Sequence, residues 1–170
     1  MSLALRRAVL PSPLGELVLV TDEAGALRLL EWTDQPARIT RWLDRQYPGA
    51  AITDAAAPPA LAAALAAYFS GRVTALDGLV VAEQGSAFQR RVWAALRLIS
   101  AGTTTSYGEL AARLGDAGAM RAVGLANGAN PVSLVVPCHR VIGRDGSLTG
   151  YGGGLHRKEW LLRHEGALLA

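Results

Sequence analysis

Cysteine, lysine and histidine are scarce in this chain of 170 residues, which contains one cysteine, one lysine and three histidines. A single cysteine cannot form a disulfide within the chain. The histidines, at 139, 156 and 164, do not stand at a metal-ligand spacing with Cys138, so we expect no metal site. If the chain carries out nucleophilic chemistry, we expect it at Cys138.

Long apolar runs are also missing. None approaches the length of a bilayer-spanning helix, and residues 1–10 contain two arginines with no apolar signal core after them. We therefore expect a cytoplasmic protein. Hydrophobic residues still make up 51% of the chain, which is enough to bury a core in one domain or in two small ones and argues against a mainly disordered chain.

Charge is unevenly distributed, although the net charge is only +3. Residues 1–83 contain seven arginines against nine Asp and Glu, a balance of −2, whereas residues 84–170 contain ten Lys and Arg against five, a balance of +5. A basic C-terminal half suits a polyanion such as nucleic acid. Ordinary scatter of surface charge gives the same imbalance, so this pattern alone decides nothing.

The N-terminal half has the pattern of a sheet covered by helices. Three extended apolar runs separated by turn residues predict an antiparallel meander, and two stretches with helical signals follow them. The runs are 7–10, 16–21 and 26–32, and the helices are 37–46 and 59–70. No catalytic constellation is present, so we interpret this half as a scaffold.

The C-terminal half is predicted to be mostly helical. Ser86 with Gln89 and Ser106 with Glu109 have the spacing of capping boxes, each before an amphipathic helix. A glycine-containing turn then leads to a helix over about 119–129, and such a helix pair outlines a helix-turn-helix. The second helix is rich in Ala and Gly, which favours either close approach to a narrow minor groove or tight packing in the core. Arg121, its only charged residue, favours the groove.

The segment from Pro137 to Arg140 places Cys138 beside two side chains able to carry positive charge, which favours a thiolate. A lone cysteine is also commonly a small buried hydrophobe. Cys138 and His139 are adjacent, so on an extension of the strand-like run 133–136 their side chains would point to opposite faces. A turn or a bridging water is required if His139 is to act as a base on Cys138.

Two further features lie near the C-terminus. Glu165 occupies the last turn of a helix predicted over 155–165, where the dipole disfavours a carboxylate, so it is either a functional misfit or a solvated end charge. Tyr151 lies in a glycine-rich stretch, 150–154, that suits a pocket wall or a flexible linker.

These motifs occur in an order that resembles the O6-alkylguanine-DNA alkyltransferases, and the resemblance covers about residues 86–166. The segments that carry it are 106–111, 121–124, Asn130-Pro131, 137–141, Gly150-Tyr151, 159–162 and 164–166. It implies an α/β protein of the α+β type. Residues 1–83 would form a ribonuclease-H-like scaffold domain, and residues 84–170 a winged-helix-like DNA-binding and alkyl-acceptor domain.

The resemblance also implies a chemistry for the acceptor site. Cys138 would accept the alkyl group irreversibly from O6-alkylguanine, and from O4-alkylthymine, in double-stranded DNA. His139 would take the thiol proton through a water, Glu165 would orient His139, and Asn130 would brace the turn around Cys138. Because the thioether is stable, each molecule would act once. No cofactor is implied, and a monomer is expected.

The remaining roles that the resemblance implies concern the flipped base. Tyr107 would hydrogen-bond the guanine ring, and Arg121 would fill the gap left in the duplex. The backbone of Val141 would take the exocyclic amine, while Tyr151 and the amide of Gly152 would line the pocket near O6. Some relatives bind zinc through N-terminal Cys and His residues, which residues 1–83 lack, so no zinc is expected.

Two other classes of protein share part of this pattern. A winged-helix regulator explains the basic half and the helix pair but gives no reason for Cys138 and His139. A Cys-His hydrolase uses the same pair for acyl transfer and turns over repeatedly.

Overall fold

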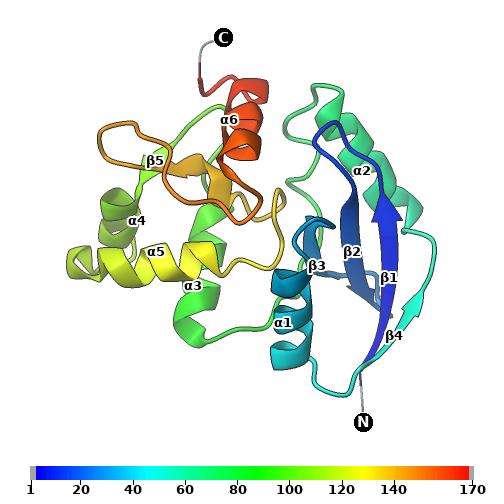
Figure 1. The fold of residues 1–170 in the computed structure, drawn as a ribbon. Coiled ribbons are helices and arrows are strands. Elements are labelled where there is room, and N and C mark those ends of the chain that lie inside the picture. Colours follow the sequence, from blue (N-terminus) through cyan, green and yellow to red (C-terminus); the bar gives the residue numbers. More distant parts are fainter. Residues whose placement is uncertain (1–2, 169–170) are drawn as a thin grey trace. The chain divides into compact units, whose positions relative to one another are not determined.

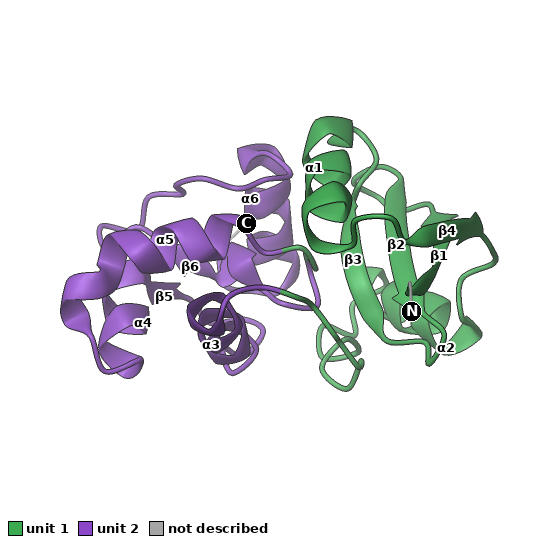
Figure 2. Cartoon of the chain, turned by 90° about the horizontal axis from the view of Figure 1, so that it is seen from below, with its two compact units in different colours: residues 1–84, 131–133 green, residues 85–130, 134–170 purple. Residues whose placement is uncertain are grey.

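Two compact units make up the chain in a computed structural model that describes residues 3–168 (Figure 2). Unit 1 comprises residues 1–84 and 131–133, and unit 2 comprises residues 85–130 and 134–170. The division expected at 83/84 is therefore incomplete, because Pro131–Ser133 belongs to unit 1 although its chain neighbours belong to unit 2. Local sequence patterns do not reveal a segment whose hydrogen-bond partners lie in a distant strand.

A four-stranded mixed sheet forms the centre of unit 1 (Figure 1). Its order is β3-β2-β1-β4, and its strands are β1 (Ala4–Leu10), β2 (Leu17–Asp22), β3 (Leu27–Trp32) and β4 (Ala51–Asp54). The expected antiparallel meander of the first three strands is confirmed. The sequence analysis missed β4, which pairs parallel to β1 with Ile52 opposite Leu5. Three of its four residues are exposed, so it gives no alternating apolar signal.

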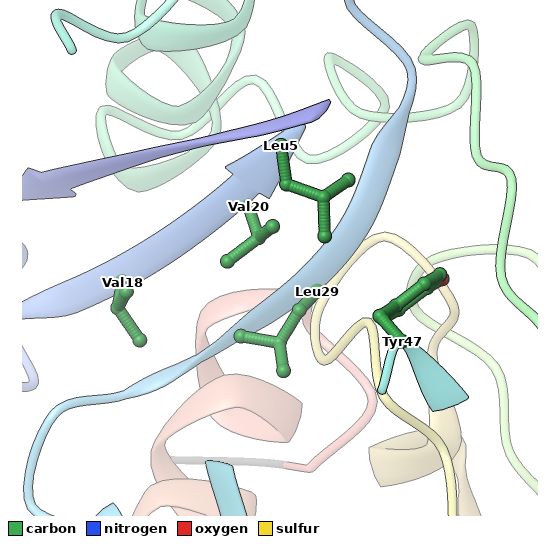
Figure 3. Packing of buried hydrophobic residues seen from close by; sticks show 5 residues of the cluster. All are labelled: Leu5, Val18, Val20, Leu29 and Tyr47. Carbon is green, nitrogen blue, oxygen red and sulfur yellow. The ribbon is translucent and has the colours of Figure 1, made fainter. Parts of the chain in front are cut away.

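Helices α1 (Pro36–Gln46) and α2 (Pro59–Phe69) lie on opposite sides of this sheet (Figures 1 and 2). Each has a proline in its first turn, where the missing N–H removes no helical bond. Half-buried residues of α1 pack on a cluster of buried side chains (Figure 3). The cluster consists of Leu5, Val18, Val20, Leu29 and Tyr47, with Ile39, Trp42 and Leu43 of α1 against it.

The free edge of β3 is covered by two short segments of chain. Leu27 donates its N–H to Val80 at 3.0 Å, and its carbonyl accepts from Ala82 at 2.8 Å. Leu30 forms the same kind of pair with residues 131–133, donating to Pro131 and accepting from Ser133 at 2.9 Å each. These bonds satisfy backbone groups that an exposed edge would offer to other chains.

A buried carboxylate strengthens the second of these attachments. Glu31 is 2% exposed and accepts hydrogen bonds from the Ser133 hydroxyl at 3.3 Å and from Nε of Arg38 at 3.0 Å. Because a buried charge requires hydrogen-bonded partners, Glu31 fixes residues 131–133 against β3 by a side chain as well as by the backbone.

Unit 2 is mostly helical, as expected. Its elements are α3 (Ala87–Leu96), β5 (Thr105–Ser106), α4 (Tyr107–Arg113), the 3-10 turn η1 (Ala117–Ala119), α5 (Met120–Gly128), the 3-10 turn η2 (Cys138–Arg140), β6 (Val141–Ile142) and α6 (Leu155–His164). The capping box of Ser86 and Gln89 is confirmed. At α4 only half of the expected box forms, because Glu109 accepts from the Thr105 and Ser106 hydroxyls instead of the N-cap N–H.

Helices α4 and α5, joined through η1, form the helix pair predicted from the sequence (Figure 1). The indole N–H of Trp93 in α3 donates to the carbonyl of Ala126 at 2.8 Å and ties α5 to the core of unit 2. Within the described residues, none of the helices is both long and apolar enough to cross a membrane.

Replacement of Leu5 by alanine tests the core of unit 1. Leu5 is 1% exposed, so Leu5→Ala should lower the free energy of unfolding by about 2–5 kcal/mol through lost burial and a new cavity. Val9 lies in the same strand but is 49% exposed, and Val9→Ala should change it by no more than about 0.5 kcal/mol. Urea unfolding followed by circular dichroism measures both; equal losses would contradict this assignment of the core.

Candidate active site

Cys138 lies in a tight turn and not at the end of a strand. Pro137 has φ −82° and ψ 65°, and the N–H of Cys138 donates to the carbonyl of Val136 at 2.8 Å, which is an inverse γ-turn. The 3-10 turn η2 follows directly, with Arg140 N–H donating to Pro137 at 3.0 Å. The strand-like reading of residues 133–136 is therefore wrong, and the turn required by the adjacency of Cys138 and His139 is present.

Strained backbone and side-chain amides replace the strand that the apolar pattern suggested. Leu134 has φ +72°, a conformation uncommon for a residue with a side chain. The amide of Asn130 donates to the carbonyl of Val136 at 2.7 Å, so Asn130 lies where a brace for the turn is needed. Asn127 donates to the carbonyl of Cys138 at 3.4 Å. Side chains in the last turn of α5 and just beyond it thus donate to the carbonyls on both sides of Pro137.

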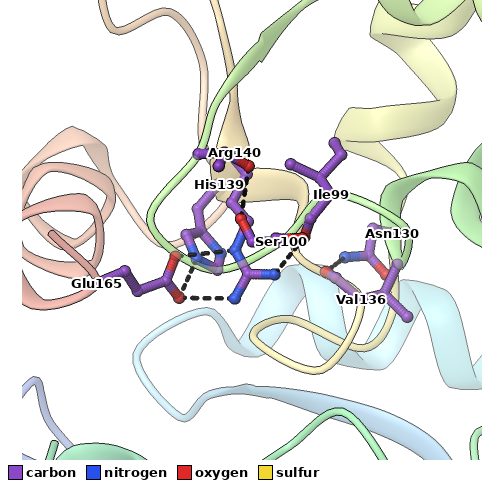
Figure 4. A network of polar contacts seen from close by, with 8 residues as sticks. Ile99, Ser100, Asn130, Val136, His139, Arg140 and Glu165 are labelled. Carbon is purple, nitrogen blue, oxygen red and sulfur yellow. Dashed lines mark hydrogen bonds and ion pairs between the residues drawn. The ribbon is translucent and has the colours of Figure 1, made fainter. Parts of the chain in front are cut away.

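The carboxylate of Glu165 binds two neighbouring side chains of η2 (Figure 4). Nε2 of His139 lies 2.8 Å from Oε2, and Arg140 donates from Nε to Oε1 at 2.8 Å and from Nη2 to Oε2 at 3.0 Å. His139 is 0% exposed and Glu165 is 6% exposed. Of the two readings left open for Glu165, the solvated end charge is wrong.

Burial and hydrogen bonding set the protonation of this pair. Burial lowers the pKa of His139 and outweighs the opposite effect of Glu165, while the charges of Arg140 and Lys158 lower it further. Burial alone raises the pKa of the Glu165 carboxyl, but hydrogen bonds from His139 and Arg140 outweigh it and hold that pKa below its ordinary value. His139 is therefore neutral beside a carboxylate.

The tautomer of His139 follows from the same contact. A carboxylate only accepts hydrogen bonds, so Nε2 carries the proton and Nδ1 keeps its lone pair. Nδ1 is buried and forms no hydrogen bond with the described residues. It is the basic nitrogen of the site and is available to accept a proton.

A two-residue parallel sheet brings Tyr107 close to the chain that follows Cys138. Thr105 of β5 pairs with Val141 of β6, so the first residue of α4 lies beside the chain that leaves η2. The hydroxyl of Tyr107 donates to the carbonyl of Thr149 at 3.2 Å, at the start of the glycine-rich loop 150–154. Tyr151 lies in that loop, and its ring packs edge-to-face against the imidazole of His139, with the ring centroids 6.5 Å apart.

Of the two roles expected for the small residues of α5, packing in the core is observed, and approach to a minor groove stays a prediction. Val123, Ala126 and Asn127 are buried, which is the packing role. Gly124 lies close to Tyr107, because a Cβ at that position would meet its ring at 3.8 Å. Arg121 is exposed, apart from the buried cluster of η2, and Leu125 is 72% exposed. The outer face of α5 thus presents one charge, small residues and two large apolar side chains, Met120 and Leu125.

Comparison with known proteins assigns the family. The model described as "6-O-methylguanine DNA methyltransferase, DNA binding domain" matches residues 87–167. A relative from Salmonella typhimurium named "Methylated-DNA--protein-cysteine methyltransferase" is 54% identical over 160 residues, or 93% of this chain and 94% of the relative. One of the same name from Mycolicibacterium paratuberculosis is 48% identical over 158 residues, or 91% and 88%. The chain belongs to this family.

The fold of the methylated-DNA--protein-cysteine methyltransferases agrees as well. The structure described as "Crystal structure of Mycobacterium tuberculosis OGT in complex with DNA" superposes with a TM-score of 0.82 at 40% identity, covering 95% of this chain and 93% of that chain. The resemblance drawn from the motifs and the α+β class are therefore confirmed.

Sequence reasoning missed two buried residues of the site, Asn127 and Lys158, and did not predict that Arg140 pairs with Glu165. Arg140 neutralises Glu165, Asn127 holds the Cys138 carbonyl, and Lys158 bonds the carbonyl of Val141 at 2.7 Å. The spacing of three residues between Asn127 and Asn130 was an available signal, although Asn130 lies beyond the last residue of α5. In the described chain no group of three or more His, Cys, Asp or Glu could hold a metal ion.

The pKa shifts of His139 and Glu165 predict acid sensitivity. Both folded-state pKa values lie below the ordinary values of 6.5 and 4.5, so the unfolded chain binds more protons and stability falls as pH falls. The free energy of unfolding should decrease below about pH 6.5 through His139 and again below about pH 4.5 through Glu165. Urea unfolding at a series of pH values measures this; a constant value between pH 7 and 5 would contradict a buried neutral His139.

Removal of the Glu165 charge tests whether this carboxylate causes the loss of stability below about pH 4.5. Glu165→Gln leaves Arg140 buried without its counterion, so it should lower the free energy of unfolding by about 3–5 kcal/mol at pH 7 and reduce the loss below pH 4.5. Glu159 is an exposed carboxylate of the same helix, paired with Arg163 at 2.9 Å, and is the matched control. Glu159→Gln should change stability by about 0.5 kcal/mol at most.

Proposed function

We propose that this methyltransferase repairs DNA by direct reversal, moving the alkyl group of O6-alkylguanine in double-stranded DNA onto Sγ of Cys138. The observation that carries the proposal is the buried contact of 2.8 Å between Nε2 of His139 and Glu165, next to the only cysteine. It leaves Nδ1 of a neutral histidine as a base beside the thiol. The same displacement on O4-alkylthymine is part of the proposal.

The transfer is a displacement at carbon. His139 takes the thiol proton through one water, with Glu165 stabilising the imidazolium that forms. The thiolate attacks the alkyl carbon, an S–C bond forms, and the C–O6 bond breaks with its electron pair passing to the guanine. The ring then takes a proton, which a hydrogen bond from the Tyr107 hydroxyl facilitates.

The pocket roles belong to groups around the acceptor turn. The carbonyls of Cys138 and Val141 accept the exocyclic amine of guanine, and Asn130 holds the turn that aims them. Tyr151 forms a wall against His139, and the amide of Gly152 donates to O6. Because Cys138 is buried, the base has to leave the stack to reach it.

Unit 2 is proposed to bind the duplex through the outer face of α5. Small residues allow that face to approach the minor groove, and Arg121 replaces the flipped nucleotide in the stack. Unit 1 is proposed to act as a scaffold. The protein works as a monomer in the cytoplasm, without a cofactor. A thioether does not hydrolyse under physiological conditions, so each molecule transfers one group and stops.

Intact mass is the direct test of the transfer. After incubation with a short duplex that contains one O6-methylguanine, the protein should gain one methyl group, localised to Cys138 and saturating at one per molecule. Undamaged duplex and Cys138→Ala should give no gain. An unchanged mass despite binding of the damaged duplex would contradict transfer and indicate a damage sensor or regulator. Product in excess of protein would indicate a hydrolase.

The role of Arg121 predicts different effects on two substrates. Arg121→Ala should slow transfer from duplex O6-methylguanine about tenfold or more, because extrusion loses its wedge, and should leave transfer from free O6-benzylguanine nearly unchanged. Arg6→Ala removes the same charge from an exposed position in β1 and is the control for net charge. Single-turnover rates measure both, and equal slowing of both substrates by Arg121→Ala would exclude extrusion as its role.

A further inference from the structure

Lys158 is a buried cation with a complete set of acceptors. It lies in α6, is 0% exposed and is the only lysine of the chain. Its Nζ donates to the carbonyls of Val141 at 2.7 Å, Thr149 at 2.8 Å and Gly150 at 3.3 Å. An ammonium has three N–H donors whereas a neutral amine has two, so this arrangement fits the charged form.

These acceptors belong to two walls of the proposed pocket. Val141 leaves the acceptor turn, and Thr149 and Gly150 lead into the loop that carries Tyr151. The carbonyl of Thr149 also accepts from Tyr107 at 3.2 Å. Lys158 thus joins the chain after Cys138 to the loop on which Tyr107 is anchored.

The neighbouring residue of α6 holds the same loop further along. Arg157 is 5% exposed, and its Nη1 donates to the carbonyl of Gly153 at 3.0 Å. Two buried cations therefore fix a glycine-rich segment that has little intrinsic preference for one conformation.

The charge of Lys158 is not neutralised in the way that Arg140 is. Arg140 has the carboxylate of Glu165, and His139 is neutral, whereas the three partners of Lys158 are uncharged carbonyls. Burial lowers the pKa of Lys158 to about 8, and the charge of Cys138 acts in the opposite direction. By reciprocity, the ammonium favours the thiolate of Cys138.

We propose that Lys158 is a positioning residue for the transfer, whose ammonium fixes the pocket loop to Val141 and stabilises the thiolate of Cys138 until the alkyl group arrives. This deepens the proposed function and rests on it for the role of the pocket. Transfer converts the thiolate of Cys138 to a neutral thioether. It therefore removes the negative charge that the ammonium of Lys158 is proposed to stabilise.

A single-site titration tests the charge coupling on the intact protein. Because Lys158 is the only lysine, ¹³C labelling at the lysine Cε gives one side-chain NMR signal. We expect its titration midpoint to be lower by about one pH unit or more after methylation of Cys138 with iodomethane, and likewise in Cys138→Ser. The same midpoint in all three proteins would overturn the proposal.

Variants test the consequence for the thiol. The rate of Cys138 alkylation by iodoacetamide, followed against pH, should show a midpoint about one unit higher in Lys158→Met. Lys158→Arg should keep the wild-type midpoint. Arg157→Met is the matched control, because it releases Gly153 from a buried cation but should not move the midpoint. An unchanged midpoint in Lys158→Met, or an equal shift in Arg157→Met, would overturn the proposal.

These measurements are independent of DNA. Iodomethane and iodoacetamide react with the thiol directly, so a protein that fails to take methyl from duplex would still give a readable result. If the NMR midpoint shifts while no methyl is transferred from DNA, the coupling holds and the proposed function fails. Should Lys158→Met not fold, the titration of the wild-type chain still decides.

Discussion

The hydrogen bonds of the Glu165 carboxylate with His139 and Arg140 are the interaction on which the rest of the site depends. The carboxylate is fully inside the protein and binds both His139 and Arg140, the two residues that follow Cys138. Arg140 also donates from Nη1 to the carbonyl of Ile99 at 2.7 Å, beyond the end of α3. The ion pair therefore connects α6, η2 and the chain after α3, and it holds the imidazole in one tautomer.

Backbone geometry around the acceptor is the second constraint. Residues 131–140 are all buried, yet they form no helix or strand beyond one bridge and the short turn η2. Such a segment needs partners for its carbonyls from elsewhere. Asn127, in the buried face of α5, and Asn130, two residues beyond the end of that helix, supply them. The turn that carries Cys138 is thus held by two amide side chains.

Much of the architecture could be predicted because it follows from periodicity and capping. The meander of β1 to β3 and the start of α3 at Ser86 are local signals. β4 could not be predicted, since its pairing with β1 depends on a neighbour and not on its own exposed residues. The strand-like reading before Pro137 failed because apolar runs also occur in buried turns. Tertiary hydrogen bonds, which sequence spacing does not encode, decided that case.

An ordered set of motifs indicated the site from the sequence alone. The sequence also showed that Cys138 and His139 are adjacent, so that a turn or a bridging water is needed to connect their side chains. The position of Glu165 in a helix end was a misfit that pointed to a partner, and the partner is His139. Arg140 and Lys158 left no such signal, because Arg and Lys are common on surfaces and only the structure shows that these two are buried.

The attachment of residues 131–133 to β3 has a consequence for biosynthesis. The edge of β3 receives one of its two covering segments from a part of the chain made about a hundred residues later, since Leu30 pairs with residues on either side of Val132. While the ribosome is still producing the helices of unit 2, that edge remains open to pairing with other nascent chains. The N-terminal sheet is therefore completed only when the segment leading to the acceptor cysteine has emerged, which couples the maturation of the two halves in time.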